Sequence, residues 1–325
     1  MKTNRRQALT DIGSLLVCAM GGEVYADTYP SRTIRVIVPR APGGGSDIIA
    51  RLLSQGMQQK SGQSFIVENR PDASAVVGAV QVANAMPDGY TVFLSDNAFY
   101  QNPAVMRKLP YDTLKDFSSV TMLAQGPVIL VTHPSVPATD LNTLVQYAKA
   151  NPGKLTYGSG GIGASTHLAG VLLNKAAGID TVHVPFRSSG PALDALLGGH
   201  ISMQFGGISS ARPQIESGKI RAIAVTGRRR DPSMPNVPTF EESGLKGVDM
   251  TSIWGIHAPA GTPLAVRRRL RELLVEVMRT PEVTKRMNDQ GYDIIGTTPE
   301  EHDAETRRLV SFWLDLGTRV NLSPD

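Results

Sequence analysis

Two glycine-rich loops are the parts of the sequence whose residue types and spacing are best suited to binding chemistry. One is Pro42-Gly43-Gly44-Gly45-Ser46-Asp47, and the other is Gly158-Ser159-Gly160-Gly161-Ile162-Gly163. Each follows a predicted strand and precedes a predicted helix. The first N–H groups of a helix have no partner within it and lie at the positive end of its dipole, so each loop is suited to hold an anion. We therefore predict that a small carboxylate binds between the two loops.

The second loop also has the G-x-G-x-x-G spacing of dinucleotide-binding proteins, with Asp180 downstream as a candidate ribose-binding acid. The alternative function is therefore an exported or dinucleotide-binding oxidoreductase that uses Gly158–Gly163. Two features weigh against it. The loop lies deep in the chain, and Asp180 precedes the next predicted strand, whereas the acid of the dinucleotide motif normally ends that strand.

The predicted ligand contacts come from both loops, the helices that follow them and the ends of two further strands. They are Pro42, Gly43, Gly44, Ser46, Asp47, Ser95, Asn97, Ser159, Gly161, Gly163, Ser165, Thr166, His167, Phe186, Arg187 and Ser188. Asp47 is placed either to complement the dipole of its own helix or to hold a water or ligand hydroxyl. Arg187 is either a bidentate partner for an anion or a surface arginine. The sequence leaves both choices open.

No pattern of catalytic or metal-binding residues accompanies these loops. The six histidines lack metal-ligand spacing, and the sequence has neither a G-x-S-x-G elbow nor a G-x-x-x-x-G-K-[ST] loop. We expect no catalytic residue, no metal and no cofactor, and thus a binding protein rather than an enzyme. The arginine runs 228–230 and 267–269 lack an accompanying recognition motif, so we interpret them as solvated patches and expect no nucleic-acid partner.

The first 26 residues have the order of a secretion leader. Lys2, Arg5 and Arg6 form a basic start, an apolar stretch covers 12–20, and small residues lead up to Ala26. We predict cleavage near Ala26 and a periplasmic protein, by general secretion or by the twin-arginine route. The single cysteine, Cys18, falls within this leader, so the exported chain would have no disulfide and no thiolate site.

Strand and helix patterns alternate along most of the chain, which predicts an α/β fold with parallel sheets covered by helices on both faces. The 325 residues suit two lobes. Helices opened by Thr262-Pro263, with the threonine as N-cap, and by Thr298-Pro299, with a capping box to Glu301, need a sheet from the first half of the chain to cover. We therefore predict a discontinuous lobe of 27–125 plus 250–325 and an inserted lobe of 126–249, joined by crossing strands.

The sequence resembles the Bordetella uptake gene (Bug) family, the periplasmic substrate-binding components of tripartite tricarboxylate transporters. The resemblance covers nearly all of the predicted mature chain. Its ordered motifs include Ala41-Pro42-Gly43-Gly44 with Asp47, Glu68-Asn69-Arg70-Pro71, Pro87-Asp88-Gly89-Tyr90, Tyr157-Gly158-Ser159, Val184-Pro185-Phe186-Arg187 and Ala258-Pro259-Ala260-Gly261-Thr262-Pro263.

The resemblance implies a periplasmic-binding-protein (Venus flytrap) fold of two Rossmann-like lobes. It implies a ligand that is a dicarboxylate, tricarboxylate, amino acid or aromatic acid, and partners that are the membrane permease subunits of a tripartite transporter. A monomer is expected, and a role in signalling instead of uptake stays open. The chain departs from the family pattern at 72–75, where a glycine-rich run is usual, and at Ser188, where glycine is common.

Overall fold

The computed structural model describes residues 29–72 and 74–320, so the predicted leader, its cleavage point and Cys18 lie outside the described residues. The strands are β1 (Ile34–Val38), β2 (Phe65–Asn69), β3 (Thr91–Ser95), β4 (Phe117–Thr132), β5 (Thr156–Ser159), β6 (Val182–Pro185), β7 (Met203–Gly207), β8 (Arg221–Val225), β9 (Thr251–Pro259) and β10 (Asp293–Ile294). The helices are α2 (Gly45–Ser61), α3 (Val76–Ala83), α4 (Asn97–Val105), α5 (Leu141–Ala150), α6 (Ser165–Ala177), α7 (Ser189–Leu197), α8 (Ile208–Glu216), α9 (Leu264–Met278), α10 (Pro281–Asp289) and α11 (Pro299–Val320).

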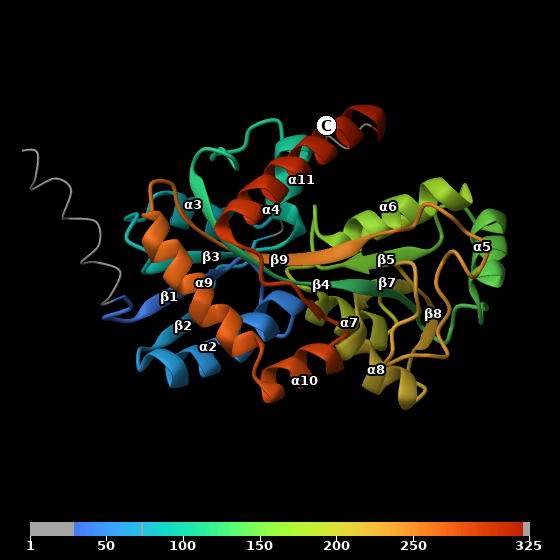
Figure 1. Ribbon diagram of the computed structural model, residues 1–325. Helices are drawn as coiled ribbons and strands as arrows, with labels where there is room; N and C mark the ends of the chain where they lie inside the picture. Colours follow the sequence, from blue (N-terminus) through green and yellow to red (C-terminus); the bar gives the residue numbers. More distant parts are fainter. Residues whose placement is uncertain (1–28, 73, 321–325) are drawn as a thin grey trace, which may run out of the picture.

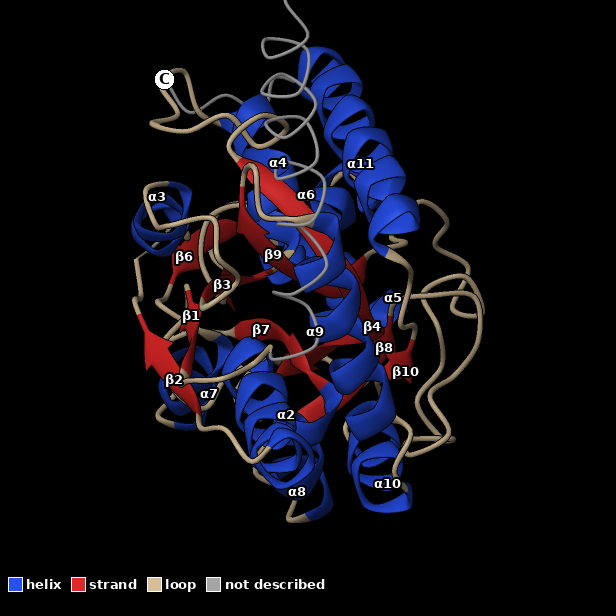
Figure 2. Ribbon diagram, turned by 60° about the vertical axis from the view of Figure 1, so that its left-hand side comes forward, coloured by secondary structure: helices blue, strands red, loops and turns tan. Residues whose placement is uncertain are grey.

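The strands form two half-sheets that the long strand β4 joins, in the order β2-β1-β3-β9-β4-β7-β5-β6, with β8 and β10 also paired to β4. Figure 1 shows β1, β2 and β3 on one side of the molecule, β5 and β7 on the other, and β4 and β9 running between them. The predicted α/β fold with two lobes is confirmed. Helices lie on both sides of the strands (Figure 2), which is how an α/β protein buries both faces of a sheet.

The prediction of purely parallel sheets is wrong, because the sheet is mixed. β1 is parallel to β2 and β3, and β5 is parallel to β6 and β7. The two central strands run against their neighbours: β9 is antiparallel to β3 and β4, and β4 is antiparallel to β7 and β8. Each half keeps its parallel βαβ part at the outside, and the strands next to the junction between the halves pair antiparallel.

The strand β4 is where the chain passes from one half to the other. Its first part, 117–127, pairs with β9, and its second part, from Val128 to Thr132, pairs with β7 and β8. At the change of partners a Cβ on Gly126 would lie 2.7 Å from the carbonyl oxygen of Gly291, so only glycine lets the two segments approach this closely.

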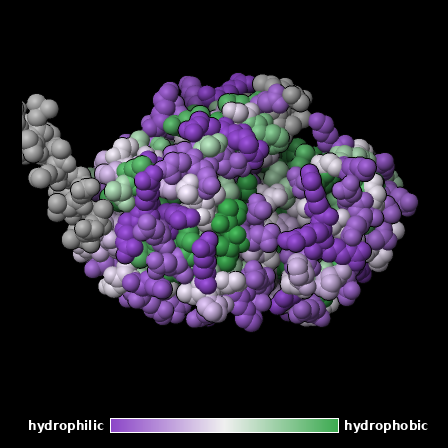
Figure 3. Space-filling view, in the orientation of Figure 1, coloured by the Kyte–Doolittle hydropathy of each residue, from purple (hydrophilic) through white to green (hydrophobic). Residues whose placement is uncertain are grey.

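Apolar stripes on the helices cover the sheet as their spacing predicts. On α2, Ile49, Leu53 and Met57 are buried against β1, β3 and helix α9. Gly56 marks the contact between the two helices, since a Cβ there would lie 2.4 Å from Val277 Cγ1. The outer face of the molecule seen in Figure 3 is largely hydrophilic, as a surface in water should be.

The two predicted Thr-Pro helix starts differ in the structure. α11 begins at Pro299 with the predicted capping box: the Thr298 N–H donates to Glu301 Oε2 at 2.8 Å, and the Glu301 N–H donates to Thr298 Oγ1 at 3.2 Å. The predicted cap at Thr262 is wrong. Pro263 occupies the N-cap of α9, and the Thr262 hydroxyl donates back to the Pro259 carbonyl at 2.8 Å, so it holds the preceding turn instead.

Candidate functional site

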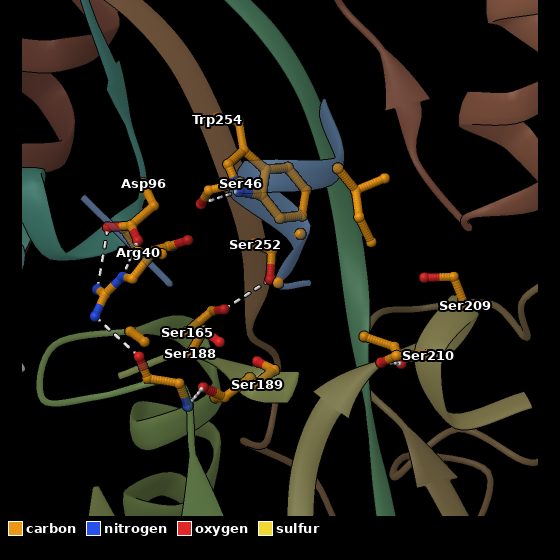
Figure 4. Close-up of a pocket in the computed structure, with 18 of the residues that line it drawn as sticks. Arg40, Ser46, Asp96, Ser165, Ser188, Ser189, Ser209, Ser210, Ser252 and Trp254 are labelled. Atoms are coloured by element: carbon orange, nitrogen blue, oxygen red, sulfur yellow. Dashed lines mark hydrogen bonds and ion pairs between the residues drawn. The ribbon is translucent and has the colours of Figure 1, made fainter. Parts of the chain in front are cut away.

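A cavity lies between the two halves of the molecule, next to the strands that join them (Figure 4). The cavity has a volume of about 60 Å³, several times the minimum that one water molecule needs. A small solute therefore fits. The cavity is lined by Arg40, Gly43, Gly44, Gly45, Ser46, Ile48, Asp96, Asn97, Pro127, Gly160, Ala164, Ser165, Thr166, Ser188, Ser189, Gly207, Ser209, Ser210, Ser252, Trp254 and Tyr292.

Among the helices of the described residues, five begin at this cavity: α2, α4, α6, α7 and α8. The N-cap residue of α4, Asp96, accepts a hydrogen bond from the Ala98 N–H at 2.9 Å. The other four helices have no hydrogen bond from the side chain of the N-cap residue to their first turn. Four sets of N–H groups and the positive ends of the helix dipoles thus converge on one space, an arrangement whose electrostatics favour negative charge.

Hydroxyl groups provide most of the polar side chains around these helix ends. Ser165 Oγ and Ser252 Oγ share a hydrogen bond at 2.6 Å, and the Trp254 indole N–H donates to Ser46 Oγ at 3.1 Å. Ser188 differs from them, because its hydroxyl is buried and has no hydrogen-bond partner among the described residues. A buried hydroxyl without a partner costs free energy, so Ser188 is available to a ligand oxygen.

The charged groups in the lining are Arg40 and Asp96, and they bind each other. Arg40 Nε lies 2.6 Å from Asp96 Oδ2, and Arg40 Nη1 donates to the carbonyl of Gly160 at 2.9 Å. Sequence inspection missed both residues. They follow the neighbouring strands β1 and β3, whose carboxyl ends meet at one edge of the sheet, and this placement was the signal that could have identified them.

Two aromatic residues form one wall of the cavity. Trp254 and Tyr292 pack with ring centroids 4.6 Å apart, and a Cβ on Gly45 would lie 2.8 Å from Trp254 and 2.9 Å from the Tyr292 hydroxyl. Burial raises the pKa of Tyr292 to about 12, so its phenol is neutral at physiological pH. Both residues belong to the C-terminal third of the chain and were not among the predicted contacts.

Seven of the predicted ligand residues line the cavity: Gly43, Gly44, Ser46, Asn97, Ser165, Thr166 and Ser188. The other nine are not in the lining: Pro42, Asp47, Ser95, Ser159, Gly161, Gly163, His167, Phe186 and Arg187. Gly160 is the one residue of the G-x-G-x-x-G loop in the lining.

Asp47 holds the first glycine loop in place. Its carboxylate accepts hydrogen bonds from the Gly43 N–H at 3.1 Å, from Asn69 Nδ2 at 2.9 Å and from Arg51 Nε at 3.0 Å. Burial alone would raise the pKa of Asp47, but the hydrogen bonds from Arg51, Asn69 and Gly43 keep that pKa below its usual value. Asp47 is thus ionised and directed at its own loop.

Hydrogen bonds and ring contacts within the protein account for several other residues outside the lining. Ser95 Oγ donates to the Gly255 carbonyl at 3.2 Å. Ser159 Oγ lies 2.6 Å from His183 Nε2, and the His183 ring stacks on His167 with centroids 4.2 Å apart. Arg187 has an exposed side chain, and its backbone carbonyl accepts a hydrogen bond from the Ala41 N–H at 3.2 Å.

A wider groove lies beside the cavity and shares Pro127 and Tyr292 with it. The arginine run 228–230 lines this groove, together with three aspartates, Asp231, Asp249 and Asp293. Within the run, Arg230 pairs with Glu242 at 2.8 Å and Arg229 lies 3.6 Å from Asp293. The groove thus carries charges of both signs, and among the described residues it lacks the converging helix N-termini that border the cavity.

Comparison with known proteins identifies the family. The sequence model of the tripartite tricarboxylate transporter family receptor (TctC) matches residues 49–307. The chain belongs to this family. The receptor is 32% identical over 301 residues to protein BugT of Bordetella pertussis, an alignment that covers 92% of each chain. Since the family consists of periplasmic solute-binding proteins, the chain is a solute-binding receptor of the periplasm.

Solved structures agree with this assignment. The receptor superposes on the periplasmic binding protein BugD with a TM-score of 0.87 and 31% identity over 91% of this chain and 100% of that one. MatC of Rhodopseudomonas palustris with bound malate gives a TM-score of 0.84 and 31% identity, covering 89% and 100% of the two chains. A second R. palustris protein, solved with adipate, gives 0.86 and 28%, covering 90% and 98%. Across residues 29–72 and 74–320, no helix combines the length and the apolar character that crossing a membrane requires.

Proposed function

We propose that this receptor captures a small carboxylate in the cavity between its lobes and delivers it to the membrane permease of a tripartite tricarboxylate-type transporter. The observation that carries the proposal is the convergence of four helix N-termini without side-chain caps on one space. The first N–H groups of each helix have no partner within the helix, and such groups bind small anions, carboxylates among them, without a metal or a cofactor. Related receptors of known structure hold malate and adipate, which supports a carboxylate as the ligand class.

The N-termini of α2, α6, α7 and α8, together called the cradle, bind the carboxylate through backbone N–H groups and hydroxyls. The net charge of the lining contributes little. The cation in the lining, Arg40, is balanced by Asp96 at 2.6 Å. A site without a surplus cation suits a receptor that must later release its cargo, because it avoids a buried ion pair with the ligand. The small volume favours a compact aliphatic acid among the dicarboxylates, tricarboxylates, amino acids and aromatic acids of the family.

The predicted residues have two roles, according to whether they lie in the cavity lining or outside it. Those in the lining contact the ligand directly through N–H groups or hydroxyls. The remaining ones, such as Asp47 and Ser159, hold the glycine loops in the shape that directs their N–H groups inward. We further propose that one lobe consists of residues 27–125 plus 250–325 and the other of residues 126–249, and that the receptor is a monomer. We also propose that it is exported with cleavage after Ala26. Sequencing the N-terminus of the periplasmic protein would test the cleavage point.

The test is binding by the purified receptor. Native mass spectrometry of protein from its own host should show a bound small acid. Calorimetric titration should show that malate or adipate binds and that the uncharged diamide of the same acid does not, because the diamide lacks the negative charge that the helix ends stabilise. Equal binding of acid and diamide would contradict an anion cradle, and NAD bound in place of an acid would favour the oxidoreductase.

A further inference from the structure

We propose that Arg40 is a clasp between the two lobes, a positioning residue that favours the closed cleft and slows release of the ligand. The closed cleft is the arrangement in which the loop 40–46 contacts the loops 158–164 and 186–188. The clasp is a statement about the movement of the lobes. It rests on the proposed function only in the experiment that measures release of a ligand.

The guanidinium of Arg40 is fixed to one lobe. Arg40 Nε and Nη2 both donate to the carboxylate of Asp96, at 2.6 and 3.3 Å, and the two side chains are only 5% and 10% exposed. Asp96 is itself fixed, because it accepts from the Ala98 N–H at the start of α4. Because the guanidinium is planar and is held through Nε and Nη2, the direction in which its third nitrogen, Nη1, points is fixed as well.

The remaining nitrogen reaches the other lobe. Arg40 Nη1 donates to the carbonyl of Gly160 at 2.9 Å, and the Gly160 N–H donates to Thr166 Oγ1 at 2.9 Å. The carbonyl that receives Arg40 therefore belongs to a peptide anchored to helix α6. The next residue adds a second link, since the Ala41 N–H donates to the carbonyl of Arg187 at 3.2 Å. Residues 40 and 41 thus hold two of the second-lobe segments that border the cavity, the loops 158–164 and 186–188.

These two interlobe bonds have a direct consequence for binding. Separation of the lobes breaks the bonds to Gly160 and Arg187, while the pair of Arg40 with Asp96 stays intact because both residues lie on the same lobe. A hydrogen bond from a charged donor shifts such an equilibrium by roughly ten- to a hundredfold. A ligand trapped in the cavity leaves through the open form, so the clasp acts mainly on the dissociation rate.

The test compares the buried Arg40–Asp96 pair, which reaches the other lobe, with a more exposed Arg–Asp pair that lies within one lobe. The clasp variant combines Arg40→Met with Asp96→Asn, which removes both charges and keeps a side chain able to cap α4. The control combines Arg32→Met with Asp88→Asn: that pair is 2.7 Å long, Asp88 also accepts from the N–H two residues on, and both residues lie in one lobe. Arg40→Lys is the second variant, because it leaves Asp96 with a cation but without the fork that reaches Gly160.

Lobe closure is measured without any ligand, by single-molecule energy transfer between dyes on Gln58→Cys and Lys175→Cys. Both positions are exposed, on α2 and α6. We expect the closed fraction to fall severalfold or more in the double Arg40 variant and in Arg40→Lys, and to stay unchanged in the control. An unchanged closed fraction in folded Arg40 variants would overturn the clasp.

Malate serves as the ligand probe. The clasp predicts that the double Arg40 variant releases malate about ten to a hundred times faster, with an association rate within about threefold of the native one. If Arg40 instead contacted the ligand, closure would be unaffected and malate affinity would still fall, which rejects the clasp. If the native receptor binds neither malate nor any other acid, the proposed function fails, and the closure measurement still decides the clasp.

Discussion

Gly44 and Ser188 lie against each other at the point where the two lobes meet over the cavity: a Cβ built on Gly44 would be 3.1 Å from Ser188 Cβ. The backbone of Gly44 does not itself require glycine, because its φ of −89° and ψ of 169° are accessible to any residue. The close approach of the two loops is what requires it. A side chain at position 44 would thus push loop 42–47 away from the second lobe, and a larger side chain would push it further.

We therefore expect Gly44→Val to abolish malate binding or weaken it by far more than tenfold, since its γ-methyl groups would force the lobes apart. Gly44→Ala should have an intermediate effect, because one methyl group at 3.1 Å needs only a small shift. The melting temperature should change little, since the fold of each lobe is untouched. Calorimetry on folded protein checks this, and native-like affinity of the valine variant would refute the cradle geometry.

Ser188→Ala tests the buried hydroxyl without a protein partner. The substitution breaks no hydrogen bond within the described structure, so the free energy of unfolding should stay the same or rise slightly. Affinity for malate should fall roughly ten- to a hundredfold, because a hydrogen bond to a charged group contributes about 1.5–3 kcal/mol. Ser217→Ala is the control, since that exposed serine bonds only the Gln214 carbonyl. Equal affinities of both variants would place the ligand away from α7.

Local sequence patterns predicted the two helices that follow the glycine loops, but not the contacts between distant parts of the chain that complete the site. The glycine loops predict α2 and α6, because the loop, the helix N-terminus and the apolar stripe of each lie within about twenty consecutive residues. The convergence of α4, α7 and α8 on the same space depends on how the half-sheets join, and no short pattern encodes that. Trp254 and Tyr292 reach the cavity from β9 and the turn after α10, far along the chain from the glycine loops.

Side-chain direction was the second limit of the sequence. Asp47 stands in a glycine loop that does line the cavity, yet its carboxylate is directed at Arg51 and Asn69. Arg40 lies only two positions before Pro42 and is buried in the lining, although an arginine at a strand end usually indicates a surface residue. Whether a charged residue is turned toward a cavity follows from its partners, and those are known only once the strands are paired.

Arg187→Ala should reduce affinity less than threefold. The side chain is exposed and outside the lining, and the contact that Arg187 makes with the first lobe uses its backbone carbonyl, which alanine retains. Titration with malate beside Gly44→Val provides the comparison. If Arg187→Ala alone destroyed binding while Gly44→Val was tolerated, a charge clamp would replace the cradle of helix ends.

Burial lowers the pKa of four histidines, His167, His183, His257 and His302, and makes the stability of the receptor depend on pH. The last two form a pair within the first lobe. His257 of β9 and His302 of α11 lie with ring centroids 4.5 Å apart, and the Nδ1 atom of each lacks a hydrogen-bond partner among the described residues. Burial lowers the pKa of His302 to about 3, and burial together with the neighbouring His302 lowers the pKa of His257 well below its usual value. Both imidazoles are therefore neutral in the folded protein at pH 5.

The unfolded chain protonates these histidines near pH 6.5, while the folded chain does so only at much lower pH, so unfolding takes up protons in between. Stability is complete above about pH 6.5 and falls as the pH drops, by about 1.4 kcal/mol per pH unit for each proton taken up. Urea unfolding between pH 7.5 and 5 measures this slope before carboxylates protonate. His302→Gln should reduce the slope by about one proton. An identical slope in the native protein and in His302→Gln would show that His302 takes up no proton on unfolding and that burial does not control its charge.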